Sequence, residues 1–162
     1  MKFGRILPLF AVLTSVIAQL YSDRYYIRAL AYDKPYIGRF YPEDKSLRPK
    51  PVGEVRFRDP ELWLFQALPN GRFILNVRGD PTGVVDDLLY AFLVDQGRTE
   101  EWVITRVPEG GPDIYTIQTS IRPGLGWVAP PGNDERQQIQ IRPLLPGPPQ
   151  VSQLFQLIPY VD

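Results

Sequence analysis

The sequence contains no cysteine and no histidine, and these two absences exclude most catalytic and metal chemistry. Without them the chain cannot build the Ser–His or Cys–His nucleophile pairs of most hydrolases, so we do not expect an enzyme. A zinc site would lack its preferred ligands, and we expect neither a metal nor a cofactor. Disulfides are excluded too, so a hydrophobic core alone must hold the 162 residues together.

The first 18 residues have the pattern of a secretory signal peptide rather than of a folded segment. Lys2 and Arg5 make a short basic start, an apolar run follows over residues 6–18, and the run ends in Val16-Ile17-Ala18. The run is too short for a transmembrane helix, which needs roughly 20 apolar residues. We therefore predict a secreted protein, with a signal peptide over 1–18 and a single domain over 19–162.

The predicted mature chain carries little net charge. Removal of residues 1–18 leaves 16 basic residues against 18 acidic ones, a formal charge of −2. Such a surface offers no electrostatic reason to bind nucleic acid or an anionic membrane. We expect neither as a partner.

Short β-strands separated by turns are the expected secondary structure. The 18 prolines and 13 glycines recur too often for helices of ordinary length. A helix is arguable only over 86–95, a segment whose length also fits a buried strand with a turn. The aromatic and β-branched clusters predict twelve strands, over 25–28, 36–38, 54–57, 62–65, 72–77, 83–85, 88–93, 102–105, 114–118, 126–128, 138–142 and 154–158.

A weak internal repeat indicates how these strands are organised. The aromatic of Glu61-Leu62-Trp63 recurs as Trp102 in Glu100-Glu101-Trp102 and as Phe155 near the end of the chain. Trp63 and Trp102 are each followed by a turn and then by an aromatic strand. Three such units predict a β-trefoil, with three four-stranded units, a six-stranded barrel and three capping hairpins.

An ordered set of short motifs resembles the basidiomycete fungal β-trefoil serine protease inhibitors of the cospin-like family. The similarity covers nearly the whole predicted mature chain, and each motif is weak by itself. The motifs are Tyr26-Ile27-Arg28, Tyr36-Ile37-Gly38-Arg39, Glu43-Asp44-Lys45-Ser46-Leu47 with Pro49-Lys50, Trp63 with Pro69-Asn70-Gly71, Glu100-Glu101-Trp102-Val103-Ile104, Gly126-Trp127-Val128 and Ile141-Arg142-Pro143-Leu144.

The resemblance implies inhibition of a trypsin-like serine endopeptidase, by a monomer, through the loop that joins the second and third strands. In this sequence that loop spans residues 39–51. Its prolines fix φ and favour extended neighbours, which lowers the entropy lost on binding. The candidate contact residues are Arg39, Phe40, Tyr41, Lys45, Ser46, Leu47 and Arg48.

Within this loop the chemistry leaves two kinds of protease open. Arg39, Lys45 and Arg48 would each suit an acidic specificity pocket, whereas Phe40 and Tyr41 would suit an apolar one. Inhibition of cysteine proteases, as in the related mycocypins, is a variant of the same hypothesis.

The main alternative is a secreted carbohydrate-binding lectin. Tyr36, Tyr41 and Trp127 could stack on sugars, although Trp127 is better explained as core and the repeated Gln-x-Trp of lectin trefoils is missing. Two further patterns carry little weight. Arg78-Gly79-Asp80 matches an integrin-binding tripeptide, but its residues are also ordinary turn residues. Asp86 and Asp87 could suggest a pair of glycosidase carboxylates, but adjacent residues of a strand point to opposite faces.

Overall fold

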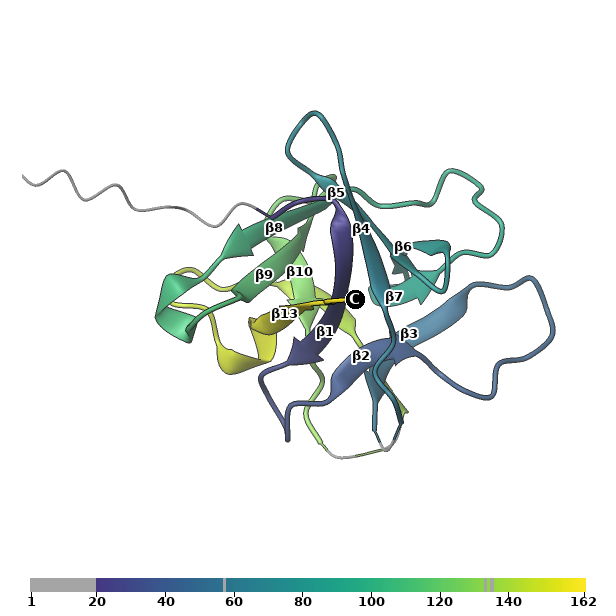
Figure 1. Cartoon of the computed structure of the whole chain (residues 1–162), viewed down its shortest axis with the longest axis horizontal. Helices are drawn as coiled ribbons and strands as arrows, with labels where there is room; N and C mark the ends of the chain where they lie inside the picture. The colour runs from purple at the N-terminus through teal and green to yellow at the C-terminus, as the bar shows by residue number, and fades with distance from the viewer. Residues whose placement is uncertain (1–19, 57, 133, 135) are drawn as a thin grey trace, which may run out of the picture.

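Strands dominate the computed structural model, which describes residues 20–56, 58–132, 134 and 136–162 (Figure 1). The predicted signal peptide over 1–18 lies outside the described residues. Two short 3-10 helices, η1 (Pro108–Gly110) and η2 (Val151–Gln153), accompany the strands. The strands are β1 (Asp23–Ala29), β2 (Tyr36–Arg39), β3 (Lys50–Val55), β4 (Trp63–Ala67), β5 (Phe73–Val77), β6 (Asp80–Val85), β7 (Leu88–Ala91), β8 (Trp102–Arg106), β9 (Ile114–Thr119), β10 (Leu125–Val128), β11 (Arg136–Gln138), β12 (Gln140–Pro143) and β13 (Phe155–Pro159).

The all-β prediction is confirmed, and the alternation of buried side chains explains why these segments form strands. In β5, Phe73, Leu75 and Val77 are buried while the residues between them are half-buried, as expected for a strand with one face on a core. The helix considered over 86–95 is wrong. Asp86 and Asp87 have φ values of 50° and 57° and form the two-residue turn of the β6–β7 hairpin.

The predicted β-trefoil arrangement is also wrong. The thirteen strands lie in one continuous antiparallel sheet that closes into a barrel, and not in three four-stranded units with a separate six-stranded barrel. The expected strand over 138–142 is divided into β11 and β12, so the last third of the chain contributes five strands.

The three capping hairpins expected of a β-trefoil are not separate. The strands after β2 that would form them are hydrogen-bonded to one another within the same sheet. β7 pairs with both β3 and β12, and β11 pairs with β3. At the break between β11 and β12, the buried Ile139 donates its amide to Val52 and accepts from Leu89 through its carbonyl. Buried backbone groups must find partners, and here the neighbouring hairpins supply them.

The repeated aromatic residues meet at one point in the core, as the repeat predicted. Trp63, Trp102 and Phe155 are fully buried and surround Trp127, with ring centroids 5.7, 5.4 and 5.7 Å from its ring. The Trp63 indole donates to the Ile37 carbonyl, and the Trp102 indole donates to the Thr82 hydroxyl. Three distant segments are thereby tied to a single side chain.

Replacing Trp127 with Ala is expected to lower the free energy of unfolding by about 3–5 kcal/mol, because it removes the ring that three other aromatics pack against. Urea denaturation followed by tryptophan fluorescence measures the loss. Leu64→Ala is the control, because Leu64 is half-exposed on β4 and its loss leaves no cavity. Equal urea midpoints for the Trp127 variant and the wild type would contradict a central role for Trp127 in the core.

Candidate functional site

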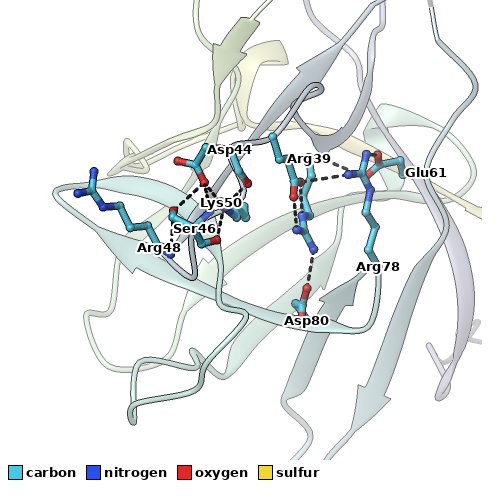
Figure 2. A network of polar contacts seen from close by, with 9 residues as sticks. Arg39, Asp44, Ser46, Arg48, Lys50, Glu61, Arg78 and Asp80 are labelled. Atoms are coloured by element: carbon cyan, nitrogen blue, oxygen red, sulfur yellow. Dashed lines mark hydrogen bonds and ion pairs between the residues drawn. The ribbon is translucent and has the colours of Figure 1, made fainter.

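The candidate site is the loop between β2 and β3, which projects from the side of the barrel (Figure 1). It is shorter than the sequence indicated, because β2 includes Arg39 and β3 begins at Lys50. Residues 40–49 therefore form the connection. Two separate polar clusters support it from inside, one around Arg39 and one around Lys50 (Figure 2).

Arg39 is the centre of the first cluster. Its side chain makes a bidentate pair with Glu43 at 2.6 and 2.5 Å and a third bond to Asp80 at 2.5 Å. Its backbone amide donates to the Glu61 carboxylate at 2.9 Å. Because Glu43 lies within the loop and Asp80 opens β6, the guanidinium fastens the loop to a neighbouring strand.

The prediction that Arg39 offers an accessible side chain to a protease is wrong, since only 4% of the residue is exposed. Burial by itself would lower the pKa of the guanidinium, but the bonds to Glu43 and Asp80 outweigh it and raise the pKa above its ordinary value. Arg39 is thus a permanently charged support beneath the loop.

Lys50 is the centre of the second cluster and is 3% exposed. Its ammonium group donates to the backbone carbonyls of Asp44 at 3.0 Å and Ser46 at 2.8 Å, and it also bonds the Asp44 carboxylate. That carboxylate accepts the Ser46 amide and hydroxyl, at 3.1 and 2.7 Å. All three donors of the lysine are used inside the loop.

These contacts predict an acid-resistant loop. The bond from Lys50, and then those from Ser46, lower the pKa of Asp44 to about 2. A carboxyl whose pKa is lower in the folded than in the unfolded chain stabilises the fold above its ordinary pKa, and that contribution is lost as the pH falls toward 2. An NMR titration of the Asp44 carboxyl should have its midpoint near about 2, and Lys50→Met should raise it. A wild-type midpoint at the ordinary aspartate pKa of 3.8 would contradict the bonds assigned to Asp44.

The remaining candidate residues differ in how they are presented. Phe40 is half-buried, and its amide donates to the Pro51 carbonyl at 3.3 Å. Tyr41 is exposed, with the Arg58 guanidinium 4.3 Å from its ring centre and its carbonyl accepting from Arg136. Ser46 is half-buried and belongs to the Lys50 cluster. Phe40 and Ser46 therefore serve the loop's own structure.

The exposed end of the loop consists of Lys45, Leu47 and Arg48. Leu47 is 71% exposed, so its side chain is accessible to a partner. The Arg48 amide donates to the Ser46 hydroxyl at 3.2 Å, and Figure 2 shows its side chain pointing away from the Lys50 cluster. No ion pair joins Lys45 or Arg48 to another residue of the described chain.

Sequence reasoning missed the residues that hold the loop. Glu43, Asp44 and Lys50 are not among the candidate contact residues, yet each forms an ion pair that supports the loop. Arg78-Gly79-Asp80 is explained by the same support. Arg78 pairs with Glu43 at 3.1 Å and with Glu61, while Asp80 pairs with Arg39. Only the alternation of both charge signs within a short loop could have pointed to these pairs.

Comparison with known proteins identifies the family. The sequence profile described as peptidase inhibitor I66 matches residues 18–158. The chain belongs to the peptidase inhibitor I66 family. A relative from Lentinula edodes, described as a serine protease inhibitor, is 35% identical over 129 residues, which are 75% of this chain and 87% of the relative.

Two solved structures resemble this I66 chain. A proteinase inhibitor from Coprinopsis cinerea has a TM-score of 0.77 at 25% identity, and the match covers 87% of this chain and 99% of that one. A salivary protein from Culex quiquefasciatus, of the Cysteine and Tryptophan-Rich family, has a TM-score of 0.66 at 13% identity. That match covers 90% of this chain and 99% of the salivary protein. The second likeness concerns the fold alone.

Within the described ranges, no cluster of three or more acidic side chains could hold a metal ion, and no helix has the length and apolar character to cross a membrane. Trp127, a possible sugar-stacking residue, is fully buried as the sequence indicated. Tyr36 is half-buried on β2, so these two aromatics do not form an exposed sugar platform.

Proposed function

We propose that this chain inhibits trypsin-like serine proteases by inserting Arg48 into their acidic specificity pocket. The observation that carries the proposal is the exposed Leu47-Arg48 tip on a loop held by two ionic clusters, which are centred on the buried Arg39 and Lys50. Rigid presentation of this kind reduces the conformational entropy lost when the protease binds. The relative from Lentinula edodes, described as a serine protease inhibitor, supports this class of target.

Arg48 fits the pocket-filling role better than Lys45 because of the backbone on either side. Around Lys45, the carbonyls of Asp44 and Ser46 both accept from the buried Lys50, and the Ser46 amide bonds to Asp44. Those groups are not free to pair with a protease backbone. The Arg48 amide donates to the Ser46 hydroxyl, but Arg48 precedes Pro49, which disfavours a helical conformation and favours an extended backbone at Arg48.

The inhibitor is expected to bind without catalysing a reaction, as a secreted monomer. Secretion remains a proposal based on the pattern over residues 1–18. The family match begins at residue 18, the last residue of the proposed signal peptide, so residues 1–17 lie outside the matched range.

Titration of purified mature protein into proteases of known active concentration tests the function. We expect stoichiometric inhibition of pancreatic trypsin or another trypsin-like protease, and weaker inhibition of proteases with apolar pockets. A matched series with papain-like cysteine proteases separates the mycocypin-like alternative. Failure to inhibit any serine protease in the panel would overturn the proposal.

A further inference from the structure

A groove lies directly beside the proposed contact loop, and a second segment forms its other side. Leu47, Arg48 and Pro49 line one side, and five residues of the 92–98 segment, which follows β7, line the other: Phe92, Leu93, Val94, Gln96 and Arg98. The groove has a volume of about 470 Å³. In Figure 1 both connections project from the same side of the barrel.

The strand register explains why these two segments meet. β3 and β7 are antiparallel, and Lys50 pairs with Ala91. Residues that precede Lys50 must therefore lie beside residues that follow Ala91, as the two chains leave the sheet together. The contact loop cannot approach a protein surface with its tip without bringing the 92–98 segment close to it.

The second segment is held in place by hydrogen bonds at both ends and within its turn. The Phe92 amide donates to the Pro81 carbonyl at 2.9 Å, and the Glu100 amide donates to the Thr82 carbonyl at 2.9 Å. The Asp95 carboxylate accepts the amides of Gly97 and Arg98, at 3.0 and 3.3 Å. Both ends of the segment and the turn within it are thus fixed before a partner arrives.

Gly83 on β6 shows how closely this segment packs. A Cβ atom at that position would lie 2.2 Å from the Arg98 carbonyl oxygen and 2.7 Å from the Phe92 ring. Only a glycine leaves room for the segment to lie against the sheet at this point. The groove is therefore a preformed feature of the barrel surface.

The lining has a defined chemical character. Leu47, Pro49, Leu93 and Val94 supply the accessible apolar surface, and Val94 is 46% exposed. Phe92 also lines the groove but is only 2% exposed. Arg48 and Arg98 are the charged residues of the lining, and both are cationic. The nearby Asp95 carboxylate accepts the amides of Gly97 and Arg98, and among the described residues it forms no ion pair with Arg48 or Arg98. This combination suits an apolar side chain that has a carboxylate next to it.

A protease–inhibitor interface buries more surface than the 40–49 loop can supply by itself. Such complexes bury about 800 Å² on each partner, contributed by roughly 20–30 residues a side. The connection over 40–49 has too few exposed residues to supply this area. A neighbouring rigid segment with exposed apolar and cationic groups must contribute, and 92–98 is adjacent by register.

We propose that residues 92–98 form a second contact segment for the same protease. A surface loop beside the protease's specificity pocket would place an apolar side chain in the groove and a carboxylate near Arg98. This inference rests on the proposed function, because it takes the 40–49 loop as the primary contact. It adds binding residues to the inhibitor that lie outside that loop.

Val94→Glu and Arg98→Glu test the contact in the full-length mature protein. Each is expected to weaken inhibition of pancreatic trypsin or of the most strongly inhibited trypsin-like protease by about 10-fold or more. Arg98→Glu should act mainly on the association rate and its salt dependence, and Val94→Glu mainly on the dissociation rate. Unchanged thermal unfolding checks that both variants fold, with Val94→Ala as a milder variant.

The matched controls are Val161→Glu and Arg106→Glu, which make the same changes at exposed positions away from the groove. Both should inhibit like the wild type. Loss of inhibition in Arg48→Ala, together with wild-type inhibition in both groove variants, would overturn this inference and leave the proposed function standing. A wild-type protein that inhibits no serine protease would overturn both.

Discussion

Replacing Arg48 with Ala is expected to weaken inhibition of a trypsin-like protease by at least about 100-fold. An arginine that fills a desolvated pocket at the centre of an interface is a typical hot spot, worth about 2–4 kcal/mol or more when truncated. The variant should keep the loop intact, because the Arg48 side chain makes no ion pair within the described chain and only its amide bonds to Ser46. The inhibition constant, measured by progress curves, reports the loss.

Lys45→Ala is the matched control for Arg48→Ala. Both residues are exposed cations in the same loop, but the backbone beside Lys45 is directed toward Lys50. We expect a change of less than about fivefold for Lys45→Ala, the range of a peripheral charge. Arg48→Lys should retain much of the inhibition, because an acidic pocket also accepts lysine. The reverse order, with Lys45 dominant, would assign the pocket-filling role to Lys45.

Replacing Arg39 with Met is expected to lower the free energy of unfolding by about 3–5 kcal/mol and to weaken inhibition as well. Removing one partner of a buried ion pair leaves the other charges without compensation. Here Asp80 on β6 would lose its ion pair with Arg39, and Glu43 in the loop would keep only its pair with Arg78. Chemical denaturation measures the free energy of unfolding. The inhibition constant measures how much binding is lost when the loop is less well ordered.

Arg78→Met separates this effect from loss of positive charge. Arg78 pairs with Glu43 and Glu61, but its side chain is 35% exposed, and an exposed pair contributes about 0–1 kcal/mol. A second comparison is Arg39→Met combined with Glu43→Gln and Asp80→Asn, which removes the buried charges together. That combination should recover part of the lost stability. Similar losses in Arg39→Met and Arg78→Met would contradict a central role for Arg39.

Short-range patterns were the reliable part of the sequence. All twelve segments expected to be strands contain strand residues, and eleven of them each overlap a single strand, because alternation and turn chemistry act over a few residues. The twelfth, over 138–142, is interrupted at Ile139, which bonds instead to Val52 and Leu89 from distant segments. No local feature of 138–142 indicates those partners.

The candidate site also has one feature that local sequence indicated and another that depends on distant segments. Its place in the chain followed from the prolines and from the family resemblance, but the roles of its cations did not. Arg39, Lys45, Arg48 and Lys50 are all cations within twelve residues of sequence. Two are buried ionic supports and two are exposed, and this difference depends on Asp80, Glu61 and the path of β3.

The sequence by itself determined the absence of Ser–His, Cys–His and disulfide chemistry, the all-β class and the convergence of its repeated aromatics on the core. Composition and local periodicity suffice for these, because each depends on residue type or on near neighbours. Only the tertiary structure decided the single closed sheet, the burial of Arg39 and Lys50, and the groove beside Arg48. Each of these depends on strands that are distant in the chain and adjacent in space, and their register has no local signature.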